Sequence, residues 1–556
     1  VDVSTRDDNA AYRALTLDVE NDQRMFNALA LLLFSGAVIA AYIMIHRFSQ
    51  QQRREIGVAM ALGVSTRQIA IRPLLVSAQI ALLGVLFGLG VGILIGNSMQ
   101  SLLESFIPLP IWDTSFQTGL FVWVAAAGFL VPFLATSIPV WQAVRVKPID
   151  AIRPLYHKAV PAGRRSRKVH AHGNTFARMP LHNLRRSPWR SGFTMVSVAL
   201  AVTVLVSFLG LIDSIFGTVD TAEDEAIGNV PERMVVSLAN FSPESAPDVI
   251  AIANADSVVA AEPTLRLGGE LFAGDESFPA ILEIMDLEEG LWRPSLVEGA
   301  LTPEPGLILA AEAASDLNVG VGDTVMLRHP QRTGLTNITF VDTEFPVAAI
   351  HPYPIRNFAY LDAAHAGLMG LDGITNMVQV LPDPTLADID VLRELFAVPG
   401  VASVQDVSAT TQGIRDQMSE FSGIIGTFVV PVVLLTMLIA FLTASINLDA
   451  RSREHATMFA FGVRVRTALT MAVTESSVIG VVATVLGVIG GIGALEWMNR
   501  ALFSSTLPDI GIEVTLQMAT VVTVVILGVV AVAVAPLFTA RRMRRMDLPG
   551  TLRLVE

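Results

Sequence analysis

The sequence contains no cysteine, and lysine occurs only three times in 556 residues. Without cysteine the chain has neither disulfides nor thiolate metal sites. The lysines follow Val, His and Arg, so none belongs to the Gly-Lys-[Ser/Thr] of a Walker A loop; they are Lys147, Lys158 and Lys168. The motifs H-E-x-x-H and G-x-S-x-G are absent as well. We therefore expect no catalytic residue, no metal and no cofactor on this chain.

Charged residues are also scarce. They make up 16% of the chain, against roughly 25% in soluble domains, and 52% of the residues are hydrophobic. Seven runs are long and apolar enough to cross about 30 Å of hydrocarbon. They are Met25–Ile45, Pro73–Asn97, Thr118–Val140, Phe193–Ile212, Gly423–Ile446, Ala468–Leu495 and Gln517–Thr539. We predict an α-helical polytopic membrane protein with seven transmembrane helices.

Arginine and lysine gather in alternate connecting segments. The segments rich in them are 46–72, 141–192, 447–467 and the C-terminal tail with "RRMRRM" (541–546). Residues 98–117 have none and residues 496–516 have one. Because basic loops stay in the cytoplasm, the C-terminus is expected inside, and residues 217–421 outside, a bacterial cytoplasmic membrane. That outer segment holds 32 acidic residues and 8 arginines, which argues against nucleic acid as a partner.

The chain repeats itself. A shift of 399 residues aligns Glu55 with Glu454, Gly63 with Gly462, Gly88 with Gly487 and Gly92 with Gly491. Similar membrane composition alone explains the last two pairs, but not a shared Glu-x7-Gly before them. The second copy has an additional first helix at 193–212. By symmetry we expect that the first copy lacks its own first helix and most of its outer domain, and opens with the polar residues 1–24.

A short charged helix recurs in the two copies. At 53–62, Ile56 and Met60 share one side, and Glu55 near the N-terminus is favoured by the helix dipole. Gly63 suits the left-handed position that ends a helix, and Ser65 or Thr66 can cap the next one. The pattern predicts a short helix at the cytoplasmic surface. It either docks on a partner or is an interfacial anchor on anionic lipid.

Four stretches resemble the FtsX/MacB-type ABC transporter permease family. They are "RREIGVAMALGVSTRQI" (53–69), "VKPIDAIRP" (146–154), "LHNLRRSPWRSGFTMVSVALAV" (181–202) and "VEGALTPEPGLILAAEAASDLNVGVGDTVMLRH" (297–329). The resemblance covers essentially the whole chain. It implies a double-module permease that lacks its N-terminal helix and most of its first outer domain. The second copy departs from the family pattern, with His455 and Ala456 in place of Ile56 and Gly57, and Glu475 in place of Val76.

In this family the charged helix is the coupling helix, which rests in a cleft of the ATPase. The resemblance therefore implies a cytoplasmic ABC ATPase dimer as partner, with ATP and Mg bound there. Membrane lipids are further partners, together with an extracytoplasmic adaptor, lipoprotein or envelope enzyme. The ATPase-coupling residues it implies are Arg53, Arg54, Glu55, Gly63, Arg451, Arg453, Glu454 and Gly462. Glu475 is an intramembrane candidate, either paired with an arginine or packed as an interfacial carboxylate.

The outer segment contains two stretches with the same order of elements. Residues 233–267 and 376–409 each show a strand, a Pro turn, a helix and a strand. Two such βαβ units predict a split ferredoxin-like α+β core. Its four strands should share one sheet with both helices on one face. The residues between the units are β-rich with one helix at 311–317, which predicts an inserted subdomain at 268–375.

These features give a domain plan and a function. We expect a permease that couples ATP hydrolysis to motion of the outer domain and exports or extracts a lipid, lipoprotein, peptide or amphiphile. The alternative is a non-transporting regulator of a cell-envelope enzyme. A secondary transporter needs more intramembrane polar groups than Glu475. The plan is 1–24, end of the first outer region; 25–154, first module (coupling helix 53–63); 155–192, basic linker; 193–216, transmembrane helix; 217–421, outer MacB-like domain; and 422–556, second module (coupling helix 451–462).

Overall fold

The computed structural model divides the chain into two compact units. It describes residues 52–106, 117–145, 188–274, 276–301, 304–332, 338–426, 429–450, 452–500 and 509–544, with residues 23, 27, 30, 31, 34–42, 44–46 and 49. The helical unit comprises Phe26–Gly210, Ile424–Trp497 and Leu516–Glu556. The outer unit comprises Val1–Met25, Leu211–Gly423 and Met498–Thr515. Arg451, the basic linker 155–187 and most of residues 1–24 lie outside the described residues.

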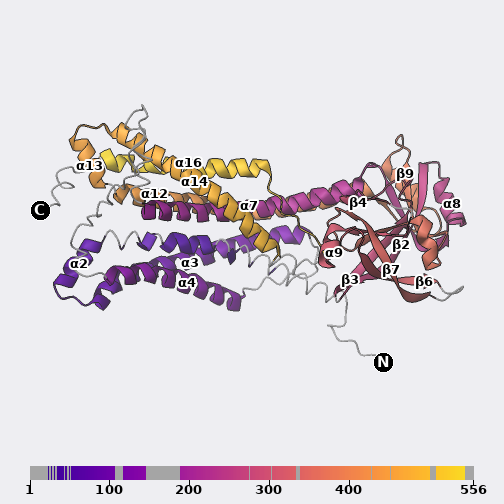
Figure 1. Ribbon diagram of the computed structural model, residues 1–556, viewed down its shortest axis with the longest axis horizontal. Coiled ribbons are helices and arrows are strands. Elements are labelled where there is room, and N and C mark those ends of the chain that lie inside the picture. The colour runs from indigo at the N-terminus through magenta and orange to yellow at the C-terminus, as the bar shows by residue number, and fades with distance from the viewer. Residues whose placement is uncertain are drawn as a thin grey trace, which may run out of the picture. The chain divides into compact units, whose positions relative to one another are not determined.

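The helical unit is a bundle of long apolar helices with two short ones at one end (Figure 1). Its elements are α2 (Arg53–Ala61), α3 (Thr66–Phe106), α4 (Thr118–Val144), α7 (Pro188–Ile227), α12 (Val429–Ala450), α13 (Ser452–Ala460), α14 (Val465–Met498) and α16 (Met518–Arg544). Among the described residues, α3, α4, α7 and α14 are long and apolar enough to cross a membrane. Shorter apolar helices cover Phe34–His46, Val429–Leu442 and Met518–Val534. Several apolar helices are therefore present as predicted; of the described ones, four reach membrane-crossing length and three are shorter.

Helix α7 is much longer than the apolar run that predicted it. The run ends at Ile212, but the helix continues to Ile227 through an acidic stretch without proline. Acidic residues do not end a helix by themselves, because their side chains reach solvent without disturbing the backbone bonds. The stop comes at Gly228, whose φ of +55° is a left-handed conformation that glycine adopts without strain. The apolar run marks where hydrocarbon begins and ends, whereas the helix ends where the backbone turns.

Four strands of the outer unit share one sheet. They are β1 (Met234–Pro243), β2 (Val258–Ala273), β9 (Ile374–Pro382) and β10 (Val401–Asp406), in the order β10-β1-β9-β2 with antiparallel neighbours. Helices α8 (Pro247–Ala253) and α10 (Asp388–Phe396) pack on one face through Ile252 and Leu395, in one cluster with Val236 and Val380. The predicted common sheet with two helices on one face is confirmed. Strands β1 and β2 are parallel, with β9 between them.

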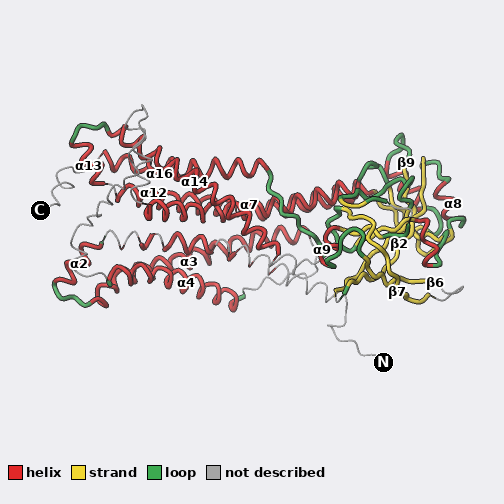
Figure 2. Tube along the Cα trace, in the orientation of Figure 1, coloured by secondary structure: helices red, strands yellow, loops and turns green. Residues whose placement is uncertain are grey.

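Strand β2 continues into a second group of strands. These are β3 (Glu276–Met285), β4 (Glu298–Gly299), β5 (Leu307–Ala310), β6 (Thr324–Arg332), β7 (Ile338–His351) and β8 (Phe358–Asp362). Figure 2 shows the strands in yellow. The helix predicted at 311–317 is α9 (Ala311–Asp316), and η3 (Ala363–Met369) follows β8. The ladder between β2 and β3 pairs Leu265 with Ile284 and Ala273 with Glu276.

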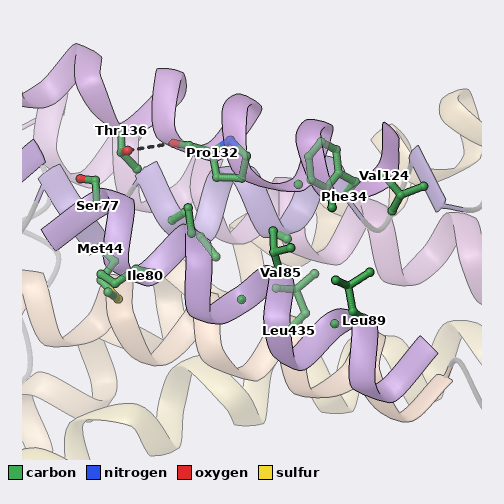
Figure 3. Close-up of a pocket in the computed structure, with 18 of the residues that line it drawn as sticks. Phe34, Met44, Ser77, Ile80, Val85, Leu89, Val124, Pro132, Thr136 and Leu435 are labelled. Atoms are coloured by element: carbon green, nitrogen blue, oxygen red, sulfur yellow. Dashed lines mark hydrogen bonds between the residues drawn. The ribbon is translucent and has the colours of Figure 1, made fainter. Parts of the chain in front are cut away.

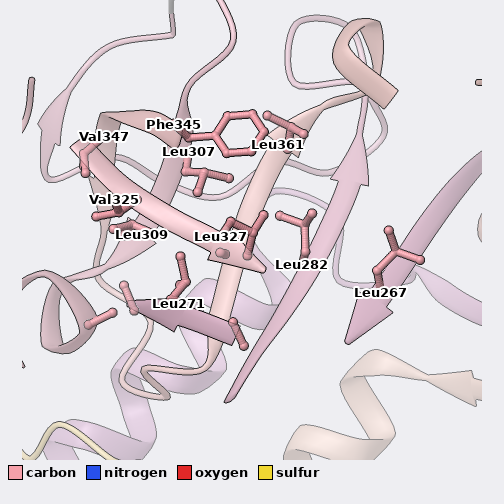
Figure 4. Packing of buried hydrophobic residues seen from close by; sticks show 14 of the residues in the cluster. Leu267, Leu271, Leu282, Leu307, Leu309, Val325, Leu327, Phe345, Val347 and Leu361 are labelled. Carbon is pink, nitrogen blue, oxygen red and sulfur yellow. The ribbon is translucent and has the colours of Figure 1, made fainter. Parts of the chain in front are cut away.

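The second group of strands has its own apolar core. Leu271, Leu282, Leu307 and Leu327 are fully buried in it, and Phe345 is 1% exposed (Figure 4). Alternate residues of β2 supply Leu265, Leu267 and Leu271 to this core, as expected for a strand with period two. The outer unit therefore has two cores, joined by one strand that contributes to both sheets.

Candidate coupling site

Both copies of the charged motif form short helices at the same end of the bundle. Helices α2 and α13 have nine residues each, with Glu55 and Glu454 exposed in their first turns. A carboxylate there interacts favourably with the positive end of the helix dipole. On the inner side Ile56 is 6% exposed and Ala456 is fully buried. Each helix thus has one side packed on its own module and another side open.

Helix α2 ends in a Schellman motif. The Gly63 N–H donates to the Met60 carbonyl at 3.0 Å, and the Val64 N–H donates to the Ala59 carbonyl at 3.0 Å. Gly63 has a φ of +87°, and no atom lies within 4 Å of where its Cβ would be, so glycine is required by conformation and not by space. The next helix, α3, then starts at Thr66, and Ser65 Oγ accepts from the Gln68 N–H at 3.4 Å.

Helix α13 ends in the same way. The Gly462 N–H donates to the Phe459 carbonyl at 3.0 Å, and the Val463 N–H donates to the Met458 carbonyl at 3.0 Å. Gly462 has a φ of +83°. Two hydrogen bonds and one left-handed glycine fix the direction of the turn in each copy. The chain therefore holds each short helix at a defined angle to the long helix that follows.

A large apolar side chain is exposed at each of these turns. Leu62 is 80% exposed and Phe461 is 84% exposed, and the 399-residue shift relates the two positions. They lie just outside the membrane-crossing parts of α3 and α14. Neither residue was predicted from the sequence, where charges and glycines define the motif. The signal was present, since a large apolar residue precedes the glycine in both copies.

The remaining candidate residues lie in two places. Arg53, Arg54 and Arg453 belong to the two short helices. Glu475 lies ten residues into α14 and is 4% exposed. At 1.5 Å per residue it is about 15 Å along the axis from the start of that helix. The two short charged helices therefore occupy equivalent positions in the two modules. Glu475 does not belong to either of them and lies in the interior of the helical bundle.

Two family models match this chain. The family model for the FtsX-like permease C-terminal domain matches residues 27–148 and 426–548, and that for the MacB-like periplasmic core domain matches residues 191–379. The chain belongs to the FtsX/MacB-type ABC transporter permeases. Permeases of this family are membrane subunits that work with a cytoplasmic ABC ATPase and carry a periplasmic domain.

Two solved structures are similar to part of this permease. The periplasmic region of MacB from Actinobacillus actinomycetemcomitans is 15% identical, with a TM-score of 0.24, and the match covers 34% of this chain and 97% of that one. The extracellular domain of the noncanonic ABC-type transporter YknZ from Gram-positive bacteria is 13% identical, with a TM-score of 0.23, and covers 31% and 98%. No curated protein matches the chain. The family assignment rests on the two family models.

The periplasmic domain of this permease is fastened to the end of α7. Arg233, 5% exposed, donates to the Gln379 side chain at 2.8 Å and to the Ala226 carbonyl at 2.7 Å. Its guanidinium also lies 4.4 Å from the centre of the Trp292 ring. Burial lowers the pKa of Arg233 to about 10, against the opposing charge of Glu283, so the group remains charged at neutral pH. This buried cation connects the last turn of α7 to strand β9.

Glu225 completes the attachment from the helix side. It accepts from the Ser295 N–H at 2.7 Å and from the Ser295 hydroxyl at 2.6 Å. The Glu225 carbonyl accepts from the Trp292 ring N–H at 3.2 Å. Helix α11 (Val407–Gly426) joins α7 through Arg415, which pairs with Asp220 at 2.6 Å and with Glu223 at 3.0 Å. Two helices thus leave the periplasmic domain side by side.

The segment before α16 is also bound to the periplasmic domain. The Gly511 N–H donates to the Pro354 carbonyl at 2.7 Å, and the Arg356 N–H donates to the Asp509 carbonyl at 3.1 Å. The Arg356 guanidinium pairs with Asp316 at 2.6 Å and with Asp509 at 3.0 Å. This segment, residues 509–515, is called the strap. Within the outer unit, the last turns of α7 and the strap are therefore both hydrogen-bonded to the periplasmic domain.

Proposed function

We propose that this chain is the permease subunit of an ABC exporter whose ATPase is a separate cytoplasmic dimer. ATP and Mg bind to that partner, and one coupling helix, α2 or α13, docks in a cleft of each ATPase subunit. ATP-driven closure moves the two helices, and the long helices pass the movement to the periplasmic domain. That movement exports or extracts a lipid, lipoprotein, peptide or amphiphilic compound, with an extracytoplasmic adaptor, lipoprotein or envelope enzyme as a further partner.

The proposal includes a finer architecture. Seven helices cross the membrane, with the C-terminus in the cytoplasm and residues 217–421 outside. The order β10-β1-β9-β2 with α8 and α10 supports a split ferredoxin-like core. Residues 268–375 are its inserted part. The ATPase-coupling group is Arg53, Arg54, Glu55 and Gly63 with Arg451, Arg453, Glu454 and Gly462.

One observation carries the coupling role. Leu62 and Phe461 are exposed at equivalent turns, each fixed by two backbone hydrogen bonds and a left-handed glycine. A lipid anchor needs apolar residues along a whole helix face. The exposed face of α13 instead carries Glu454 and Thr457 before Phe461, and that of α2 carries Glu55 and Val58 before Leu62. Exposed large apolar residues with a rigid backbone are typical of anchors that fill a pocket on a partner. Their repetition fits two equivalent clefts of an ATPase dimer.

The test is replacement of both tip residues, Leu62→Asp with Phe461→Asp. Burial of a large apolar side chain contributes about 1.5–3 kcal/mol, so each replacement should weaken ATPase binding about 10-fold to 100-fold. The double variant should insert into the membrane normally but fail to co-purify with its ATPase. Phe340→Asp is a matched control, because Phe340 is 68% exposed on the periplasmic domain. Normal ATPase binding and export by the double variant would contradict the proposal.

A further inference from the structure

The sheet formed by β10, β1, β9 and β2 has a polar pocket on the face opposite α8 and α10. Side chains alternate along a strand, and Val236 belongs to the core beneath those two helices, so Val235 faces the other way. In the ladder Val235 pairs with Gln405 of β10 and with Gln379 of β9. These three residues line a pocket of about 230 Å³. The last turn of α7 and the first turn of α11 also line it, and they belong to the outer unit, as the sheet does.

Two arginines line this pocket. Arg233, which is 5% exposed, donates through its two terminal nitrogens to the Gln379 side chain and to the Ala226 carbonyl. Arg266 of β2 donates through one terminal nitrogen to Glu283 of β3 at 3.1 Å. In both guanidinium groups the Nε–H is buried and has no hydrogen-bond partner among the described residues. Because a buried N–H group without an acceptor is unfavourable, these two groups indicate that an acceptor binds in the pocket.

The charges that line the pocket do not balance. Glu283, 5% exposed, is the one acid among its described lining residues, and its charge acts on both Arg266 and Arg233. Glu262 also acts on Arg233, but it does not line the pocket, and its two oxygens accept from backbone N–H groups. The lining therefore has one net positive charge, and a buried charge without a counter-ion is unfavourable. A ligand with a single negative charge would balance it, whereas a dianion would exceed it.

Aromatic rings form the apolar part of the pocket. Trp292 and Tyr360 pack edge to face with their ring centres 5.7 Å apart, and Tyr353 and Phe358 do so at 5.4 Å. The two guanidinium groups lie against these walls, 4.4 Å from the centre of Trp292 and 5.9 Å from the centre of Phe358. The rings thus restrict both guanidinium groups before a ligand binds, which lowers the entropic cost of binding.

The cavity bordered by α3, α4 and α12 in the helical unit has a different chemistry (Figure 3). Its two hydroxyl side chains bond their own helices: Ser77 donates to the Pro73 carbonyl at 3.0 Å and Thr136 to the Pro132 carbonyl at 2.8 Å. The described walls of that cavity therefore offer a polar ligand no side chain that is not already engaged. In the periplasmic pocket, by contrast, two charged donors remain.

We propose that the periplasmic pocket binds the carboxylate of an organic acid. The two carboxylate oxygens accept from the Nε–H groups of Arg233 and Arg266, and the apolar part of the acid lies against Trp292 and Phe358. A volume of 230 Å³ is below the roughly 300–1,000 Å³ of sites for drug-sized ligands. The pocket therefore holds a small acid or the acidic end of a longer molecule.

The ligand has a route into the pocket and a place to act. Gln405 and Thr410 are lining residues that are exposed, so the pocket opens to solvent between β10 and α11. At the other end the carboxylate reaches Arg233, the residue that connects α7 to β9. Binding should therefore strengthen this connection. No residue of the coupling site takes part, so the proposal is independent of the proposed function.

The experiment uses the 556-residue chain in lipid nanodiscs with 4-fluorobenzoate as the probe. Broadening of its fluorine NMR signal, corrected with empty nanodiscs, should give a Kd of about 1 mM or tighter. 4-Fluorobenzamide has the same shape without the charge and should bind about tenfold more weakly or less, because charge-assisted hydrogen bonds are the stronger ones. Inorganic phosphate, largely a dianion at pH 7.5, should displace the probe less well than unlabelled benzoate does.

Two competitors identify the source of the carboxylate. Displacement of the probe by decanoate and not by N-acetylphenylalanine indicates the end of an acyl chain. The reverse result indicates the C-terminus of a peptide. Displacement by neither indicates a small free acid, and displacement by both indicates a pocket that recognises the carboxylate alone. Each of these four results agrees with a carboxylate site.

One arginine variant tests the role of the Nε–H groups. Arg266→Lys keeps the positive charge and can still pair with Glu283, but it has no Nε–H group. It should weaken binding of 4-fluorobenzoate about tenfold and leave that of 4-fluorobenzamide unchanged. Arg328→Lys is the matched control, because the Arg328 side chain is 46% exposed against 41% for Arg266, pairs with Glu270 and Asp342, and does not line the pocket. The control should bind 4-fluorobenzoate as the parent does.

A second variant removes binding without removing a contact of the fold. Gln379→Glu keeps the shape of the side chain and its hydrogen bond from Arg233, and it supplies the missing negative charge from within the protein. It should bind 4-fluorobenzoate at least tenfold more weakly while its thermal stability stays equal to that of the parent or rises. Equal affinity for the acid and the amide, equal effects of Arg266→Lys and Arg328→Lys, unchanged binding by Gln379→Glu, or stronger displacement by phosphate than by benzoate would each overturn the assignment.

Discussion

His351 should make the periplasmic domain sensitive to acid. Its side chain is fully buried at the end of β7, and the Tyr353 N–H donates to its Nδ1 at 3.2 Å. Because Nδ1 is an acceptor, the neutral ring carries its proton on Nε2, which donates to the Phe358 carbonyl at 3.2 Å. A second proton on Nδ1 would face an N–H group. Burial lowers the pKa of His351 from 6.5 to about 4, and the Phe358 carbonyl only partly opposes this.

The sign and size of the effect follow from these two values. Below pH 6.5 His351 is protonated in the unfolded chain, whereas in the folded domain it stays neutral until about pH 4. The domain therefore loses stability as the pH falls through this window and keeps it above pH 6.5. At pH 5 the loss should be about 2 kcal/mol, and at most about 3 kcal/mol near pH 4.

The assay is pulse proteolysis of the purified chain in urea at pH 7, 6 and 5, which follows cleavage of the periplasmic domain. The parent should unfold at progressively lower urea concentrations as the pH falls. His351→Phe keeps an aromatic ring but cannot titrate. It should be less stable at pH 7, since two buried backbone groups lose a partner, yet its stability should change less between pH 7 and 5. If both proteins lost the same amount of stability between pH 7 and pH 5, the reasoning would be refuted.

Other predictions concern the strap, the coupling helices and the topology. Arg356→Gln should speed hydrogen exchange of the strap severalfold, because the half-exposed ion pairs to Asp316 and Asp509 together contribute about 1–2 kcal/mol; unchanged exchange would show that the backbone bonds alone hold it. Glu55→Arg with Glu454→Arg should insert normally and abolish coupling to the ATPase, more than either single change, and normal activity would make these helices lipid anchors. A single cysteine at Ser166 should resist impermeant thiol reagents in intact cells, and labelling there would reverse the topology.

Most of the fold could be predicted because the membrane and the sheet impose simple periods. Uninterrupted apolar runs identified the long helices, and the repeated order of strand, Pro turn, helix and strand identified the four strands of the first sheet. The end of α7 could not be predicted in this way. Its last turns are acidic, and the sequence carries no local signal that Glu225 and Arg233 will fasten them to a folded domain. Gly228 ends the helix, and the contacts of Glu225 and Arg233 stabilise the acidic turns before it.

Of the coupling site, only the charged residues and the glycines were predicted from the sequence. Gly63 and Gly462 were readable because a left-handed C′ position favours glycine whatever surrounds it. Leu62 and Phe461 were not, since an apolar residue in a membrane protein is ordinarily in lipid or in a core. Only the structure shows that these two side chains are exposed at the turns that end α2 and α13.

The continuous strand β2 has a consequence for the design of chimeras. Residues 258–264 pair with β9 and residues 265–273 pair with β3, so one peptide segment is a structural member of both halves. Exchange of residues 268–375 with a relative would cut through the middle of this ladder, where Gly269 faces the Arg328 carbonyl too closely for a Cβ. Junctions at the hairpin around Gly274 (φ +63°) spare the strand. Grafts of binding specificity onto this permease should therefore replace hairpin tips and leave the shared strand native.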